Sequence, residues 1–187
     1  MLLDAAHYSG WYERRKRAVL LACLTRPWFR SGFEPGCGYG LLTAELSRRC
    51  RSLLAMDGDS AAVASTIAAV ERAAHVEVRE GQVPMDWPNG TSFDLIVLSE
   101  FLYYVPKDAL DTLARKARAA LAEDGEIVAC HWRHPIPESD VPGDILQERF
   151  GDALDLACVS HVSDPDFDLC VWRRQGRGVA FGEGLVP

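Results

Sequence analysis

The sequence predicts an α/β fold in which helices cover a doubly wound, mostly parallel sheet that ends in an antiparallel hairpin. Short apolar runs alternate with helix-like segments between Phe33 and His131, which is the pattern of parallel strands joined by crossover helices. Two further strand-like runs follow with only an Asp-Pro turn between them, so we expect them to pair antiparallel. A glycine-rich turn joins the first strand to its helix, at the edge where such sheets bind ligands.

The predicted helices carry apolar side chains at three- and four-residue spacing, which gathers these side chains on one face. Pro27 ends the first helix, and Ser60 is the expected N-cap of the third. An Asp-Gly pair turns the chain after the fourth helix. In chain order, the predicted helices cover residues 10–24, 41–50, 61–74 and 108–121.

The predicted strands are short apolar runs. The run FDLIVL at residues 93–98 is apolar enough to be buried on both faces, as in the centre of a parallel sheet. The other predicted strands are the stretch that ends at Phe33 and Glu34 and residues 52–56, 75–78, 126–131, 154–161 and 167–172.

Length and charge limit the class of protein. At 187 residues the chain can build one hydrophobic core, and we expect a single domain over residues 1–175 with a flexible tail over residues 176–187. The formal net charge of -7 argues against nucleic acid as a partner, because binding to phosphates depends on a surplus of Lys and Arg. No apolar run approaches the roughly 20 residues that span a bilayer, so no membrane partner is expected.

The six cysteines are scattered and form no C-x-x-C pair, which argues against a zinc knuckle or a redox motif. They are typical of small buried side chains in a reducing compartment. Met1 leads directly to charged residues without the layout of a signal peptide, so we expect a cytoplasmic protein. The sequence does not indicate the oligomeric state.

The glycine-rich turn has the sequence FEPGCGYG at residues 33–40. Glycines there permit positive φ and let a ligand approach the backbone. A dinucleotide fingerprint, G-x-G-x-x-G, would require glycine at the position of Leu41, which disfavours an NAD(P)-binding oxidoreductase. No G-K-[ST] follows, so a phosphate-binding P-loop is excluded.

Asp57 ends the second predicted strand, about 20 residues beyond the glycine turn, where a ribose-binding acid is expected. Its carboxylate can accept hydrogen bonds from both ribose hydroxyls. Such charge-assisted bonds contribute about 1.5–3 kcal/mol each. Together with the glycine turn, Asp57 predicts a nucleoside cofactor.

The E-x-G-x-G-x-G turn and Asp57 resemble the first motifs of class I S-adenosylmethionine-dependent methyltransferases. The resemblance is narrower to the NodS-like family and extends from Trp11 to Arg174. Its segments are WYERRK, FEPGCGYG, VPMDWP, LSEFLYY, HWRHP and DFDLCVW. The resemblance implies a Rossmann-like, seven-stranded sheet with an antiparallel last strand and S-adenosylmethionine as cofactor. For the nodulation protein itself it implies N-methylation of a deacetylated chitooligosaccharide.

The resemblance also implies a set of cofactor-binding residues: Trp11, Arg15, Glu34, Gly36, Gly38, Asp57, Gly58, Gln82, Val83 and Ser99. Gln82 and Val83 would flank the adenine, although the family usually has an acidic residue at the position of Gln82. Trp11 and Arg15 would close over the cofactor, with Arg15 pairing with its carboxylate. The sequence also allows Trp11 to be a core residue and residues 14–17 to form a solvated helix face.

Ser99 and Glu100 follow the fourth strand, so we expect them beside the methyl group that is transferred. Methyl transfer from a sulfonium is an in-line displacement, in which alignment of the acceptor can contribute roughly 7–11 kcal/mol. Glu100 is the expected catalytic residue that positions the acceptor, with His131 as the alternative base. A purely structural role for His131 stays open at this point.

The expected acceptor is a small molecule or a saccharide, for example an amino sugar that is methylated on nitrogen. Tyr103, Tyr104, Trp132 and Arg133 either line its cleft or belong to the core. The sequence predicts no metal site, because a catalytic zinc ion normally has three protein ligands and no third accompanies the H-x-x-H of residues 131–134. A non-catalytic, cofactor-binding scaffold domain is the alternative from another functional class.

Overall fold

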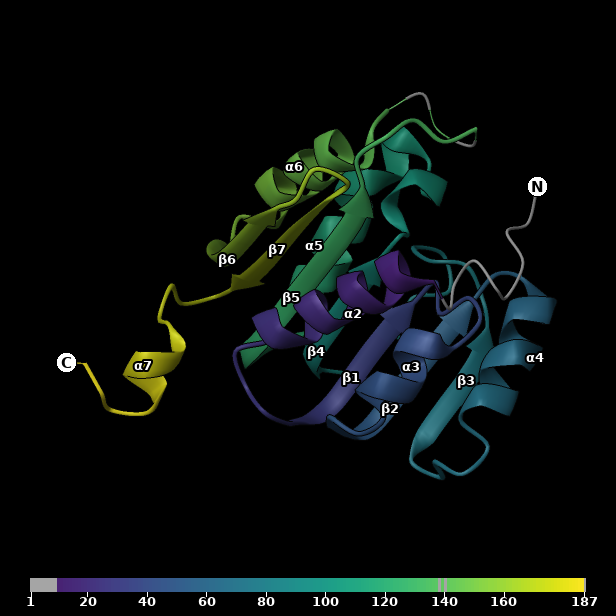
Figure 1. Ribbon diagram of the computed structural model, residues 1–187, viewed down its shortest axis with the longest axis horizontal. Coiled ribbons are helices and arrows are strands. Elements are labelled where there is room, and N and C mark those ends of the chain that lie inside the picture. The colour runs from purple at the N-terminus through teal and green to yellow at the C-terminus, as the bar shows by residue number, and fades with distance from the viewer. Residues whose placement is uncertain (1–9, 138, 140, 187) are drawn as a thin grey trace.

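The computed structural model describes residues 10–137, 139 and 141–186 and contains a seven-stranded sheet (Figure 1). The strand order is β3-β2-β1-β4-β5-β7-β6. Neighbouring strands from β3 to β5 are parallel, whereas β7 is antiparallel to both β5 and β6. The strands are β1 (Phe29–Pro35), β2 (Cys50–Asp57), β3 (Val76–Glu80), β4 (Phe93–Ser99), β5 (Leu121–Trp132), β6 (Ala157–Ser163) and β7 (Phe167–Arg173). This arrangement confirms the predicted Rossmann-like fold and its hairpin.

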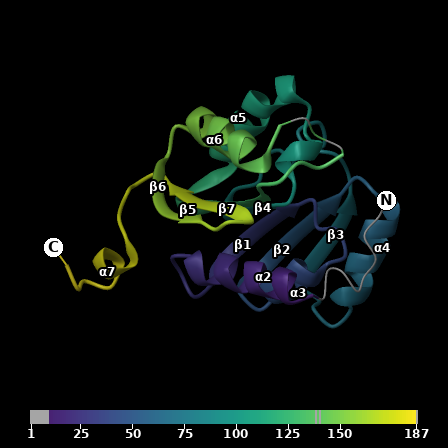
Figure 2. The same ribbon diagram turned by 45° about the horizontal axis from the view of Figure 1, so that its top comes forward.

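Helices cover both faces of the sheet (Figure 2). On one face, α5 and α6 contribute Leu113 and Phe150 to an apolar cluster. On the other face, α2 and α3 contribute Leu20 and Leu46 to a second cluster. The helices are α2 (Trp11–Cys23), α3 (Leu41–Leu46), α4 (Ser60–Ala69), α5 (Leu110–Ala120), α6 (Gly143–Leu154) and α7 (Val179–Gly182), with 3-10 turns η1 (Leu102–Tyr104) and η2 (Lys107–Ala109) before α5.

The central strand β4 brings the candidate residues to one edge of the sheet. Its residues from Phe93 to Leu98 are all buried, as the apolar run predicted. In the parallel register, Pro35 of β1 lies opposite Met56 of β2, and Ser99 lies opposite Cys130 of β5. The loops that follow these four strands therefore lie at the same edge.

Two predicted helices were too long at their carboxyl ends. The helix after the glycine turn ends at Leu46, because Cys50 already pairs with Phe29 in the sheet. The next helix ends at Ala69, five positions before the predicted end. Its N-cap is Asp59 and not Ser60, since the Asp59 carboxylate accepts from the Ala61 amide at 2.9 Å.

Helix α6 was not predicted, and Leu154, taken as the start of a strand, is the last residue of that helix. The apolar residues Leu146, Phe150 and Leu154 recur every four positions, which is the signal that indicates this helix. Strand β5 begins at Leu121, earlier than predicted, and the predicted Asp-Gly turn lies within it as a shift of register against β4.

The segment after residue 175 contains the short helix α7, which lies apart from the sheet in both views (Figures 1 and 2). The expected flexibility of this tail and the single-domain boundary stay predictions. In the part of the chain that the structure describes, no helix combines the length and hydropathy that a membrane span requires.

Candidate active site

The glycine turn after β1 needs its glycines for different reasons. All three have positive φ, namely +76° at Gly36, +54° at Gly38 and +75° at Gly40. A Cβ on Gly36 would lie 2.7 Å from the ring of Phe101, and one on Gly40 would lie 2.7 Å from the Cα of Thr66. A Cβ on Gly38 would have no other atom within 4 Å. The outer two glycines thus permit close packing, while the middle one faces open space.

Asp57, at the end of β2, holds the shape of this turn. Its Oδ2 atom accepts from the Gly38 amide at 2.9 Å, and its Oδ1 atom accepts from the Asp59 amide at 3.0 Å. An ionised carboxylate has about four acceptor positions, so two are left for a ligand. Asp57 can therefore organise the loop and bind hydroxyl groups at the same time.

Glu34 lies under the glycine turn with only 3% of its surface exposed. Its Oε2 atom has no hydrogen-bond partner among the described residues. Burial raises the pKa of Glu34 to about 8, the Thr43 hydroxyl acts in the opposite direction, and the charge of Asp57 raises the pKa further. A cationic ligand group would both supply the missing donor and favour the ionised carboxylate.

Replacing Glu34 by glutamine is expected to change how stability depends on pH. Glu34 has a pKa of about 8 in the folded protein, against 4.5 for an ordinary glutamate. Between these two values the folded state binds a proton that the unfolded state has lost, so wild-type stability falls as the pH rises through this window. Glu34→Gln lacks this proton, and its melting temperature relative to wild type should therefore rise across the same window.

The measurement is thermal unfolding of the ligand-free protein at several pH values from below 4.5 to above 8. The matched control is Glu71→Gln, which changes an exposed glutamate in the turn after α4. The curve of this control should run parallel to that of wild type. A parallel curve for Glu34→Gln as well would contradict the proposed protonation of Glu34.

Gly58, Gln82 and Val83 come together where β2 and β3 end. A Cβ on Gly58 would lie 2.8 Å from Cγ of Gln82, and Val83 is buried beside it. The backbone N–H of Gln82 donates to Oδ2 of Asp86 at 2.8 Å. Asp86 thus brings a carboxylate to this turn, four residues after the position where the family usually has an acidic residue. Sequence reasoning did not single out Asp86.

Glu100 follows β4 in a loop that packs on the glycine turn through Phe101. Its φ of 54° is positive, which is unusual for a residue with a side chain. Its Oε2 atom accepts from the Tyr103 hydroxyl, and its Oε1 atom lies 3.2 Å from Nζ of Lys16. The Glu100 carboxylate is thus held in one orientation beside the glycine turn.

Lys16 of α2 is a candidate site residue that sequence reasoning did not single out. A solvated face for residues 14–17 was one alternative, but only 2% of Lys16 is exposed. Its Nζ atom lies 2.9 Å from Glu13 and 3.2 Å from Glu100. Burial lowers the pKa of Lys16, but the charges of Glu100 and Glu13 outweigh this effect and raise it. The ammonium group stays charged and balances two carboxylates.

His131 is fully buried at the end of β5, and both its ring nitrogens have partners. Nε2 accepts from the Leu102 amide at 3.1 Å, so Nδ1 carries the proton and donates to Oε1 of Gln147 at 2.9 Å. Burial lowers the pKa of His131 to about 4. This geometry argues against His131 as a base and indicates that it anchors the η1 loop.

Comparison with known proteins decides the family. The family model described as "Methyltransferase domain" matches residues 33–125. A Pseudomonas syringae crystal structure, described provisionally as a methyltransferase, is 36% identical, with a TM-score of 0.77 and coverage of 87% of this chain and 99% of that one. The chain belongs to the class I S-adenosylmethionine-dependent methyltransferases. S-adenosylmethionine is the methyl donor of this family.

The resemblance to NodS is also found. Nodulation protein S of Sinorhizobium fredii (strain NBRC 101917 / NGR234) is 28% identical over 127 residues, which is 67% of this chain. The match spans 57% of the nodulation protein, so the chain corresponds to little more than half of it. The structure of the N-methyltransferase NodS from Bradyrhizobium japonicum WM9 with S-adenosyl-L-homocysteine has a TM-score of 0.77 at 22% identity, covers 90% of each chain and shares the fold.

The residues at the glycine turn of this methyltransferase fit its cofactor. The open space at Gly38 lets a ligand approach the backbone, and the unpaired Oε2 of Glu34 can accept from the ammonium group of the methionine part. Asp57 has acceptor positions for the ribose hydroxyls. Ser99 lies at the same edge of the sheet. The individual contacts stay predictions.

Trp11 and Arg15 differ in how free they are to reach the cofactor. Trp11 is 71% exposed at the start of α2, so it is not a core residue. The guanidinium of Arg15 instead lies 2.6 Å from the carboxylate of Asp164, in the turn between β6 and β7. It also lies over the ring of Phe167. Arg15 can pair with the cofactor carboxylate only if its guanidinium binds both carboxylates at once or its ion pair with Asp164 breaks.

The four candidate acceptor-cleft residues separate into two groups. Tyr103 is buried, and Trp132 packs edge-on against Tyr12 with 5.1 Å between ring centroids. Arg133 forms an ion pair with Asp144 and donates hydrogen bonds to the Ser163 hydroxyl and the Asp164 carbonyl. Tyr104 is 62% exposed and can contact a ligand.

The two histidines of the H-x-x-H segment have separate partners. The exposed His134 pairs with Asp166 at 3.0 Å, whereas His131 binds Leu102 and Gln147, so the two do not form one site.

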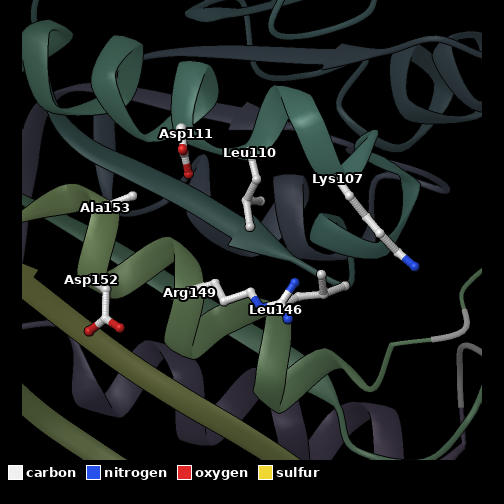
Figure 3. Close-up of a pocket in the computed structure, with 7 residues that line it drawn as sticks. All are labelled: Lys107, Leu110, Asp111, Leu146, Arg149, Asp152 and Ala153. Atoms are coloured by element: carbon white, nitrogen blue, oxygen red, sulfur yellow. The ribbon is translucent and has the colours of Figure 1, made fainter.

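A separate surface pocket of about 440 Å³ lies between α5 and α6 (Figure 3). One wall carries Lys107, Leu110 and Asp111, and the other carries Leu146, Arg149, Asp152 and Ala153. None of these residues belongs to the glycine turn or to the loop of Glu100. The pocket is therefore distinct from the cofactor site.

Proposed function

We propose that this protein transfers a methyl group from S-adenosylmethionine to a nitrogen atom of a small-molecule or saccharide acceptor, with an amino sugar as the leading candidate. The observation that carries the proposal is the orientation of Glu100 by Lys16 and Tyr103 on a loop that packs against the glycine turn. The similarity to nodulation protein S and the NodS N-methyltransferase fold support nitrogen as the acceptor atom.

The cofactor supplies an electrophilic methyl group on a sulfonium. The protein has to hold an acceptor lone pair in line with that group, and little further acid or base chemistry is needed. A protonated amine has no free lone pair, so the site must also favour its neutral form. The Glu100 carboxylate can hydrogen-bond the amine and take up the proton that leaves as the new C–N bond forms.

The residues around Glu100 suit an aminated sugar. The exposed Tyr104 packs on Tyr103, which donates to Glu100, so Tyr104 can stack on a sugar face while the carboxylate of Glu100 binds its amino group. The ion pair with Lys16 orients the Glu100 carboxylate, which pre-organises it for this contact.

Replacing Glu100 by glutamine is expected to lower kcat/KM for an amino-sugar acceptor by about 100- to 10,000-fold, the usual contribution of a positioned acid or base. S-adenosylhomocysteine formation would be measured with glucosamine and partly deacetylated chitin oligosaccharides as acceptors. Cofactor affinity of Glu100→Gln should stay close to that of wild type. Glu71→Gln serves as the matched control, and near-normal turnover of Glu100→Gln would contradict the role of Glu100.

A further inference from the structure

Three potential metal ligands meet on the hairpin of β6 and β7, away from the cofactor loop. His161 of β6 lies directly across from Cys170 of β7, and Asp168 is two residues before Cys170 on the same face. Their ligand atoms all lie within 4.8 Å of one another. None of the three belongs to the H-x-x-H segment, although Asp168 lies opposite His131 in the sheet. Pairing of β6 with β7 is what brings the three residues together.

The distances already resemble those of a tetrahedral metal site. Nε2 of His161 lies 2.9 and 3.2 Å from the two Asp168 oxygens, and Sγ of Cys170 lies 3.9 Å from Oδ2 of Asp168. Zinc bonds of about 2.0–2.3 Å place neighbouring ligand atoms about 3.3–3.8 Å apart. All three ligand atoms lie within 4.8 Å of one another, so shifts of about 1 Å or less would bring them to this spacing.

The surroundings of Asp168 favour a cation. Within the described part of the chain, the ion pairs of Asp168 involve His161 and no lysine or arginine. Gln147 of α6 donates to Oδ2 of Asp168 at 2.8 Å, and the same Gln147 accepts from His131. Hydrogen bonds of this kind orient the ligands in established metal sites. The Asp168 carboxylate is thus held in place by Gln147. Among its ion-pair partners, only a protonated His161 would balance its charge.

Cys158 brings a second thiol to this cluster. Its side chain interacts with that of Cys170. A metal ion binds the thiolate form of cysteine and displaces the thiol proton. Nitrogen, oxygen and sulfur ligands together suit zinc and cobalt better than magnesium or calcium.

We propose that His161, Asp168 and Cys170 form a binding site for a zinc-like divalent cation that clamps the edge strand β6 to β7. The proposal is independent of methyl transfer and concerns the β6–β7 hairpin, whereas the glycine turn follows β1. Binding would connect His161 of β6 to Asp168 and Cys170 of β7 through the ion and release the thiol proton of Cys170 to the buffer.

The test is titration of the metal-free, reduced full-length protein with Co²⁺, followed by displacement with Zn²⁺. A 1:1 complex with a near-ultraviolet thiolate-to-cobalt band and intense visible bands is expected, together with a higher melting temperature. His161→Ala and Cys170→Ser should each weaken binding by more than about 10-fold, the lower end of losses for outer-shell changes. His161 is 53% exposed, so its variant should fold normally.

The matched control is His134→Ala. His134 is also exposed and lies 3.0 Å from a carboxylate, that of Asp166, but it does not belong to the cluster of His161, Asp168 and Cys170. This variant should keep wild-type affinity and the thiolate band. Absence of the band in wild type would overturn the proposal, as would undiminished binding by both His161→Ala and Cys170→Ser.

Discussion

Replacing Asp57 by alanine is expected to raise the dissociation constant of S-adenosylhomocysteine by at least about 100-fold. Two charge-assisted hydrogen bonds to the ribose would be lost, at about 1.5–3 kcal/mol each. The Gly38 and Asp59 amides would lose their acceptor as well, which loosens the turn. Calorimetric titration of wild type and Asp57→Ala measures this change, with NAD as a comparison ligand.

Asp59→Ala is the matched control for this experiment. Asp59 is an exposed carboxylate two residues away that caps α4 and contributes about 1 kcal/mol to stability by that role. Its removal should lower the melting temperature and leave cofactor affinity almost unchanged. Equal affinities of Asp57→Ala and wild type would contradict the ribose-binding role of Asp57, and tight NAD binding would contradict the cofactor.

Replacing Lys16 by methionine is expected to lower the free energy of unfolding by about 3–5 kcal/mol, as is typical when one partner of a buried ion pair is removed. Methionine approximates the length and volume of the lysine chain, so packing changes little. The loss arises because Glu13 and Glu100 are left near each other without a compensating cation. Denaturant unfolding at neutral pH measures the difference.

Two further variants test this explanation. Lys16→Met combined with Glu100→Gln removes one of the two stranded charges, so it should recover part of the lost stability. Lys107→Met replaces an exposed lysine at the pocket of Figure 3 and should change the free energy of unfolding by less than about 0.5 kcal/mol. A loss below about 1 kcal/mol for Lys16→Met would show that the buried ammonium group is not needed for stability.

The parallel part of the fold was predictable because each strand has its own local signal. The apolar run of β4 and the glycine turn after β1 indicate their structures without long-range information. Helix ends were less predictable, because tertiary pairing overrides helical spacing. Cys50, for example, fits a helix pattern but pairs with Phe29 in the sheet. Helix α6 was not predicted, although its buried apolar residues recur at helical spacing.

The places of the candidate cofactor residues in the fold were predictable to the extent that these residues lie next to strand ends. The role of Lys16 was not predictable, since nothing local in a run of charged residues shows which one turns inward. The partners of His131 also come from distant segments, as Gln147 lies in the unpredicted α6 and Leu102 lies in the loop after β4. Asp86 could have been found by searching for a nearby carboxylate once Gln82 departed from the family pattern.

The chain of hydrogen bonds from Asp168 through Gln147 and His131 to the Leu102 amide has a consequence for kinetic experiments. Burial lowers the pKa of His131 to about 4, so its imidazole is uncharged near neutral pH. The loop beside Glu100 is therefore anchored by a contact that does not titrate in the range where an amine acceptor loses its proton. An inflection in the rate near neutral pH would accordingly report on the acceptor or on groups other than this buried imidazole.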